Sequence, residues 1–404
     1  MNPDNEARSA NPRRRAHAHH AGPAGLGVLL AVLCGTTALA QDGVPGVGQI
    51  GGPIGPMTQA EYRLWRQGRE VFDRDFDVTL GVGLPDFNAN SCRACHSDPV
   101  MGGAGPLEVN VSRFGHDGGG LLPFSDLPGG QAASKLRPPP DGTRENIPDG
   151  NPDPASDADV FEQRQTPTLL GMGLMDGIPD EVILANEDPN DLDRDGILGV
   201  ARIIMVNGQP EVGRFGWKAQ VPHTADFVRD AMGAEIGITT PDDGRGFAFE
   251  TDADAVPDPE LSLSDIDKMA FFLQKLAPPF PSGESTPQIQ SGQLLFSALR
   301  CDRCHIPTLD GADGPVPLYS DLLLHDVMGE AFRGMAEPGA DVGLYRTPPL
   351  WGIKDTAPYL HDGRAETLEV AIAMHRSEAL FSSIGFQSLS KDEQRHLLQF
   401  LKSL

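Results

Sequence analysis

The most constraining feature of this sequence is the pentapeptide Cys-x-x-Cys-His, which occurs twice, at residues 92–96 and 301–305. This spacing is typical of covalent attachment of a c-type haem. The two thiols form thioethers with the haem vinyl groups, and the adjacent histidine binds the iron. We therefore predict two covalently bound haem c groups. The residues that hold them are Cys92, Cys95, His96, Cys301, Cys304 and His305.

A single motif of this kind could also belong to a zinc site or a redox-active dithiol. The chain has five cysteines, and only Cys34 lies outside the two motifs. Cys34 falls in a segment with the pattern of a secretion signal, in which Arg13–Arg15 precede the apolar residues 25–35 and the small residues Ala38–Ala40. We expect a signal peptide over residues 1–40, cleavage near Ala40 and a periplasmic location. An exported chain without a spare cysteine disfavours both alternatives.

The net charge of −25 narrows the range of partners. Such an acidic chain disfavours binding to nucleic acid or to anionic lipid. It favours basic soluble partners, such as a mono-haem cytochrome c or a cupredoxin that donates electrons, although the charge could also serve solubility alone. The apolar run 25–35 is too short for a stable membrane span.

The chain repeats itself, and the repeat predicts its domain plan. Each half opens with a helix that carries Gly-x-x-x-Phe, at residues 58–72 and 286–296. Each of these helices begins with a threonine, the expected N-cap, and leads into a haem motif. Each half then has the pattern Thr-Pro-x-Leu-x-Gly, at residues 166–171 and 347–352.

Each half closes on an amphipathic helix, over residues 263–276 and 389–404, and we expect Ser264 and Ser390 to be the N-caps. Helix, haem motif, turn and closing helix is the order of a small cytochrome c domain. We therefore predict a mainly α fold of two tandem cytochrome c-like haem domains with long Gly/Pro/Asp-rich loops. The expected boundaries are 1–40 for the signal peptide, 41–284 for the first haem domain and 285–404 for the second.

This plan resembles the bacterial di-haem cytochrome c peroxidase superfamily, and most closely its di-haem oxidoreductase branch of peroxidases and thiol oxidoreductases. Three stretches carry the resemblance: residues 346–352 (Arg-Thr-Pro-Pro-Leu-Trp-Gly), 356–364 (Thr-Ala-Pro-Tyr-Leu-His-Asp-Gly-Arg) and 213–219 (Gly-Arg-Phe-Gly-Trp-Lys-Ala). The resemblance implies an enzyme that reduces hydrogen peroxide at the first haem with electrons that enter at the second haem.

The resemblance also implies which residues lie opposite the irons. In the peroxidases the sixth ligand of the second haem follows the position of His361 at an offset that selects His375, on a helix predicted over residues 367–375. The alternative is a surface histidine near a helix end. His361 itself is implied as a haem-propionate or structural partner. For the first haem the candidate is His116, which could equally be a solvated loop histidine.

Two further residues match catalytic positions of the peroxidases. Trp217 matches the tryptophan between the two haems, where it can relay electrons, and Glu235 lies near the position of a distal acid. A positioned carboxyl group suits peroxide cleavage because the leaving oxygen must be protonated. The alternatives are core packing for Trp217 and an exposed helix carboxylate for Glu235.

Residues 191–196 read Asp-x-Asp-x-Asp-Gly, which is typical of a calcium loop. The expected ligands are Asp191, Asp193 and Asp195. Arg202 occupies the twelfth position, where an EF-hand has glutamate, so the sequence predicts a looser calcium loop or an acidic surface turn. The resemblance alone implies a second calcium site that involves Thr356 and Pro358.

Two other functions remain open on this scaffold. One is an oxidase or oxygenase of another substrate, such as a thiol. The other is a non-enzymatic electron-transfer protein in which both irons are six-coordinate.

Overall fold

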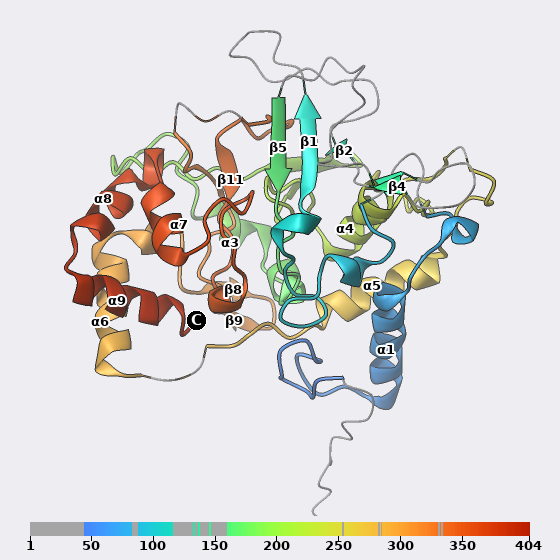
Figure 1. Ribbon diagram of the computed structural model, residues 1–404, viewed down its shortest axis with the longest axis horizontal. Coiled ribbons are helices and arrows are strands. Elements are labelled where there is room, and N and C mark those ends of the chain that lie inside the picture. The colour runs from blue at the N-terminus through green and yellow to red at the C-terminus, as the bar shows by residue number, and fades with distance from the viewer. Residues whose placement is uncertain are drawn as a thin grey trace, which may run out of the picture. The chain divides into compact units, whose positions relative to one another are not determined.

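The computed structural model describes residues 44–82, 88–115 and 160–404, apart from residues 253, 282, 284, 330, 331 and 333. It also describes the short strand segments 132–133, 136–137 and 145–146. The predicted signal peptide, Cys34 and His116 lie outside the described residues. Residues 40–404 form one compact unit, to which the following description applies (Figure 1).

The first helical group is formed by α1 (Gln59–Asp73), α4 (Thr224–Ala231) and α5 (Leu263–Gln274), with α5 in contact with both of the others. Thr58 caps α1 in a capping box with Glu61, as predicted. The helices α1 and α5 approach so closely at Gly68 that a Cβ atom there would clash with the backbone carbonyl of Lys268. Glycine permits this approach because it has no side chain. The first Gly-x-x-x-Phe motif is therefore a helix-packing motif.

The second helical group contains α6 (Pro287–Ala298), α7 (Leu368–Met374), α8 (Leu380–Ser388) and α9 (Lys391–Leu401). Here α6 packs on α9, and α7 packs on α8 (Figure 1). The predicted caps Thr286 and Ser390 are both confirmed. Gly292 meets the backbone of His396 just as Gly68 meets that of Lys268. The second Gly-x-x-x-Phe motif thus has the same packing role as the first.

One predicted cap is wrong. The N-cap of α5 is Ser262, whose hydroxyl oxygen accepts the backbone N–H of Asp265 at 3.2 Å. The expected cap, Ser264, already lies within the helix, because Leu263 is its first residue. Both serines precede acidic residues, and the sequence pattern alone did not separate them.

Shorter helical elements complete the helices of the described residues. The helices α2 (Met172–Asp176) and α3 (Asp180–Leu184) lie before residues 188–196, which we call the acidic loop. Of these two helices, α2 packs on α5 and α4 of the first group. Single 3₁₀ turns occupy Val78–Leu80, Cys92–Ala94, Leu107–Val109, Cys301–Arg303, Ile353–Asp355 and Ser377–Ala379. Helices form the two groups, as the predicted mainly α fold requires, and the small sheets between them were not predicted.

All strand pairs in the described residues are antiparallel. A three-stranded sheet has the order β2-β1-β5, with Ser112 opposite Gln163. The other sheets are the pairs β3-β4, β6-β7, β8-β9 and β10-β11. The strands are β1 (Val111–Gly115), β2 (Ala132–Ala133), β3 (Leu136–Arg137), β4 (Glu145–Asn146), β5 (Val160–Arg164), β6 (Ile203–Val206), β7 (Gln209–Val212), β8 (Leu309–Gly311), β9 (Gly314–Val316), β10 (Leu324–Asp326) and β11 (Leu344–Arg346).

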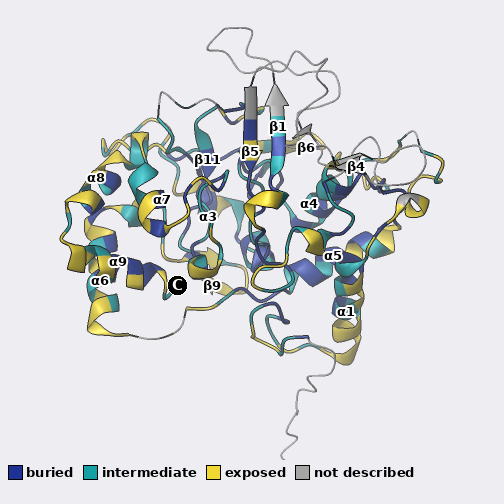
Figure 2. Ribbon diagram, viewed as in Figure 1, coloured by how far each residue is buried: buried dark blue, intermediate teal, exposed yellow. Residues whose placement is uncertain are grey.

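Each helical group has its own hydrophobic cluster (Figure 2). Phe72 packs on Phe272 in the first, with ring centroids 5.4 Å apart, and Phe296 packs on Phe400 in the second at 5.3 Å. Trp351 and several residues between 309 and 323 join the first cluster, although they belong to the second predicted domain. The domain boundary at residue 284 stays a prediction.

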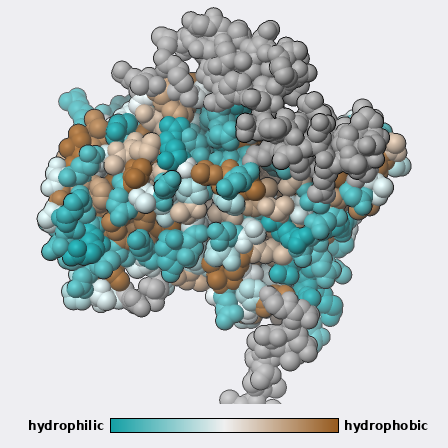
Figure 3. All heavy atoms as spheres, in the orientation of Figure 1, coloured by the Kyte–Doolittle hydropathy of each residue, from teal (hydrophilic) through white to brown (hydrophobic). Residues whose placement is uncertain are grey.

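The face drawn in Figure 3 is mostly hydrophilic where its residues are described, with small groups of hydrophobic atoms. No described helix combines the length and the apolar character that a bilayer crossing requires.

Candidate functional site

The two Cys-x-x-Cys-His motifs adopt the same local structure. Each begins on a 3₁₀ turn, and the N–H of the motif histidine donates to the carbonyl of the first cysteine, at 2.9 Å for His96 and 3.0 Å for His305. This turn brings the two cysteines and the histidine of each motif together. Both motifs thus have the same backbone geometry at their cysteines and histidine.

The motif histidines are held in the tautomer that a metal needs. His96 Nδ1 lies 3.2 Å from the carbonyl of Gly103 and 3.1 Å from that of Pro167, and His305 Nδ1 lies 3.0 Å from the carbonyl of Tyr319. A proton on Nδ1 leaves the lone pair of Nε2 for iron. Burial lowers the pKa of both imidazoles to about 4, so both are neutral near pH 7.

Each motif faces its own cavity. The first cavity has a volume of about 380 Å³ and contains Cys92, Cys95 and His96. The second has a volume of about 260 Å³ and contains Cys301, Cys304 and His305. Both cavities are bounded by a shared wall, which consists of Gln165, Thr166, Pro167, Leu169, Gly216, Trp217 and Phe227.

The residues of both cavities fit a haem group. Burial raises the pKa of Cys92 and Cys301 to about 12, which suits a thiol that becomes a neutral thioether better than a zinc thiolate. In the second cavity the buried Nε2 of His361 and Nε1 of Trp351 have no hydrogen-bond partner among the described residues. A haem propionate is an acceptor that would satisfy such groups.

His375 lines the second cavity together with His305. It is the C-cap of α7, whose N-cap is Thr367, so the helix predicted over residues 367–375 is present. Its Nδ1 donates to the carbonyl of Ala371 at 2.7 Å, and burial lowers its pKa, so the neutral ring can present Nε2 to a metal. Its neighbour Met374 is not among the described lining residues, whereas Met328 is.

His361 also borders the second cavity and is buried. Its ring stacks on Tyr345 with centroids 3.9 Å apart, and burial together with nearby cations such as Arg164 holds its pKa well below the usual value. Thr356 and Pro358 line the same cavity.

Glu235 and Trp217 both reach the first cavity. Glu235 lies on the π-helical turn Met232–Ile236 that extends α4, a distortion that is frequent at functional sites. Asn88 contacts Glu235 through its side-chain amide and through its backbone N–H. Trp217 is half-buried in the shared wall, where its indole N–H donates to the carbonyl of Gln165 at 2.7 Å.

Sequence reasoning missed a cluster of buried charges at the first cavity. Glu337 pairs with Arg202 at 2.8 Å and also contacts Arg113 and Arg164. Although burial opposes ionisation, Arg113 and the other guanidinium groups lower the pKa of Glu337 to about 2. Asp230 lines the same cavity, where burial and the charge of Glu337 raise its pKa to about 6. These residues come from distant segments, so no sequence spacing indicated them.

The acidic loop brings together a different set from the one predicted. The carboxylates of Asp188, Asp191 and Asp193 lie within 4.8 Å of one another. The third predicted residue, Asp195, instead accepts the backbone N–H of Ile197 and lies 3.8 Å from Arg303 in the second haem motif. These three carboxylates could hold a calcium ion.

Comparisons with known proteins match parts of the chain, and the matched family region includes the second motif. The family described as "Di-haem oxidoreductase, putative peroxidase" matches residues 155–404. Cytochrome-c peroxidase IdrP2 of Pseudomonas sp. (strain SCT) is 30% identical over 156 residues, which cover 31% of this chain and 42% of the relative. The chain therefore spans less than half the length of this curated relative.

Two solved structures resemble the chain more distantly. The diheme peroxidase BthA from Burkholderia thailandensis E264 has a TM-score of 0.44 and 15% identity, with coverage of 89% of this chain and 90% of that chain. A MauG-like protein associated with microbial copper homeostasis has a TM-score of 0.41 and 16% identity, with coverage of 90% and 94%. These scores are too low to carry an argument. The family match extends over more than half of the sequence, and the chain therefore belongs to the di-haem oxidoreductase family of enzymes.

Proposed function

We propose that this enzyme is an exported peroxidase with two covalently attached haem c groups, which reduces hydrogen peroxide in the first cavity with electrons received in the second. The observation that carries the proposal is the difference between the two cavities. Glu235 reaches only the first, and His375 reaches only the second. Haem iron supplies the electron-transfer chemistry that peroxide reduction needs.

In the first cavity the protein's task is proton delivery. Reduction of peroxide to two waters consumes two protons and two electrons. Glu235 would protonate the leaving oxygen while Asn88 holds its carboxyl group in place. The carboxyl group must take up a new proton after each turnover, and Asp230 in the same cavity can hold a proton at mildly acidic pH because its pKa is raised to about 6.

In the second cavity the protein's task is to keep the metal closed to substrate. The neutral imidazoles of His305 and His375 would both bind the iron, and ligation by two histidines favours electron transfer over the binding of small molecules. Trp217 in the shared wall would relay electrons to the first cavity. The donor would be a small basic electron carrier, such as a mono-haem cytochrome c or a cupredoxin, because the chain carries a net charge of −25.

Substitution of Glu235 by glutamine tests the proposal. Gln keeps the size of the side chain but cannot give up a proton, so peroxide turnover should fall by roughly 10²-fold or more. The haem spectra should remain unchanged. The control is Glu181→Gln, at an exposed carboxylate on α3 that lines neither cavity.

Wild-type turnover in Glu235→Gln would contradict the role of Glu235. Absence of peroxide activity in the wild-type protein would contradict the peroxidase proposal itself. A parallel assay with thiols would then examine the alternative substrate.

A further inference from the structure

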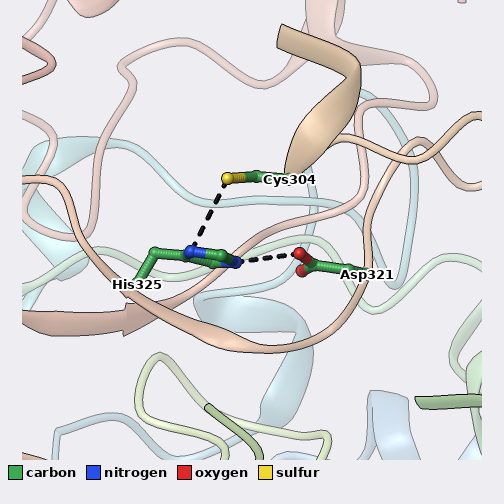
Figure 4. Close-up of side chains that lie close together, drawn as sticks. All are labelled: Cys304, Asp321 and His325. Atoms are coloured by element: carbon green, nitrogen blue, oxygen red, sulfur yellow. Dashed lines mark hydrogen bonds and ion pairs between the residues drawn. The ribbon is translucent and has the colours of Figure 1, made fainter. Parts of the chain in front are cut away.

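A buried ionic cluster beside the second cavity has no role in the function proposed so far. His325 on β10 lies between two carboxylates, with Nε2 2.8 Å from Asp321 and Nδ1 2.7 Å from Glu378. All three side chains are at most 5% exposed. Figure 4 shows His325 between Asp321 and Cys304, whose sulfur lies 3.6 Å from Nδ1.

His325 is a cation in this setting. A ring whose two nitrogens both face carboxylates must donate through both, which requires the doubly protonated form. Burial opposes this charge, but the Asp321 carboxylate outweighs it and raises the pKa of His325 well above its usual value. His325 is therefore unsuited to ligate iron, although it lines the second cavity. A separate metal ion here would compete with thioether formation at Cys304.

Asp321 connects the cluster to the haem motif. Its backbone N–H donates to the carbonyl of Cys304 at 2.9 Å, directly before His305. One of its carboxylate oxygens also accepts the N–H of Leu323 at 2.9 Å. The Asp321 carboxylate is thus fixed relative to the segment that carries the proximal ligand.

Glu378 connects the cluster to the segment that carries His375. It lies three residues after His375, and its carboxylate accepts the N–H groups of Asp326 at 2.8 Å and Leu198 at 2.9 Å. Next to His375, the N–H of Arg376 donates to the carbonyl of Val327 at 2.9 Å. The segment after α7 is therefore attached to the strand that carries His325.

We propose that His325 is a positioning residue: its imidazolium joins Asp321 to Glu378 and so keeps His375 in place in the cavity that it shares with His305. This inference rests on the proposed assignment of His375 as the sixth ligand. Without the cation, two buried carboxylates would face each other with no countercharge, which strongly disfavours the packed arrangement. The segment 375–378 would then move away, and the sixth position would open.

The experiment compares variants of the holoprotein by EPR and absorption spectroscopy, with the first haem as an internal reference. His375→Ala should convert the second haem fully from low spin to high spin. His325→Gln, which removes the positive charge, should convert most of the second haem from low spin to high spin. Added imidazole should restore low spin at the second haem in both variants, because free ligand can bind at an open metal site in a folded protein. Imidazole should also bind at the open first haem, so the first haem is the reference only in spectra recorded before imidazole is added. The matched control is His396→Gln, since His396 on α9 contacts Ser291 and does not line the cavity.

The outcomes test separately the assignment of His375 as the sixth ligand and that of His325 as a positioning residue. A wild-type spectrum in His325→Gln, combined with high spin in His375→Ala, would overturn the positioning role and leave His375 as the ligand. A wild-type spectrum in His375→Ala would overturn the ligand assignment, and the positioning role with it. If His325→Gln does not accumulate as holoprotein, Glu378→Gln keeps the size and the acceptor oxygen, and it should also raise the high-spin fraction. A wild-type spectrum in that variant would overturn the inference.

Discussion

The two cavities share a construction and differ in what faces the motif histidine. In both, a capped helix with Gly-x-x-x-Phe leads into a 3₁₀ turn, and the histidine donates Nδ1–H to a backbone carbonyl. The first cavity then adds the carboxyl groups of Glu235 and Asp230, whereas the second adds the imidazole of His375. Two cavities built around the same motif therefore differ in only a few lining residues, and the chemistry proposed for each depends on these residues.

The largest expected effect is the loss of haem on substitution of the motif cysteines. Cys92→Ala/Cys95→Ala should lose only the first haem, and Cys301→Ala/Cys304→Ala only the second, because each cavity has its own motif. Haem staining of the denatured protein and intact mass measure this directly. A denatured wild-type protein with one covalent haem or none would contradict the prediction that each cavity holds a covalently attached haem.

The next largest expected effect is a loss of stability when the charge cluster around Glu337 at the first cavity is disrupted. Glu337→Gln should lower the free energy of unfolding at pH 7 by about 3–5 kcal/mol, because it leaves buried guanidinium groups without their shared carboxylate. The folded-state pKa of Glu337, about 2, lies below its usual 4.5, so its contribution is complete above pH 4.5 and is lost as the pH falls towards 2.

Denaturant melts between pH 7 and pH 2 test this. The difference in stability between wild type and Glu337→Gln should shrink across the acid range, while the exposed control Glu366→Gln should follow wild type throughout. A constant difference at every pH would mean that the arginines do not hold Glu337 ionised.

A smaller effect is expected at the shared wall. Trp217→Phe should slow electron transfer between the haems by roughly tenfold or more, equivalent to about 1.4 kcal/mol of activation free energy. Phe keeps the packing but is much harder to oxidise, so peroxide binding should persist. Stopped-flow reduction measures the rate. Trp65→Phe is the control, since Trp65 is buried and lines neither cavity. Equal rates in both variants would remove Trp217 from the electron path.

The smallest effect concerns the acidic loop, for which we propose calcium binding. An ion that binds only the folded state raises the melting temperature, so a chelator should lower it by a few degrees. Asp191→Asn/Asp193→Asn should lose this response, and the exposed pair Asp310→Asn/Asp313→Asn should keep it. Identical melts of metal-loaded protein with and without chelator would exclude a calcium site.

Local signals were predictable from the sequence. The caps Thr58, Thr286 and Ser390, the two haem motifs and the helix before His375 all depend on residues a few positions apart. Such spacings are visible in a sequence because the backbone geometry of a turn fixes them.

Tertiary features were not predictable in this way. Asp321 and Glu378 meet at His325 although 57 positions separate them, and Glu337 meets arginines from three other segments. The small sheets that position these side chains consist of strands of two to five residues, too short for a clear alternation of polar and apolar residues.

The central claim is that the first haem is open to small molecules and the second is closed. Cyanide titration of the oxidised protein, followed by EPR, tests it most directly. We predict saturation at one cyanide per chain, with loss of a high-spin signal from the first haem and no change in the low-spin signal of the second. His375→Ala should bind a second equivalent. A wild-type protein that binds no cyanide, or binds it at the second haem, would contradict the account, and in the first case Met232 and Met269, which line the first cavity, become candidate ligands.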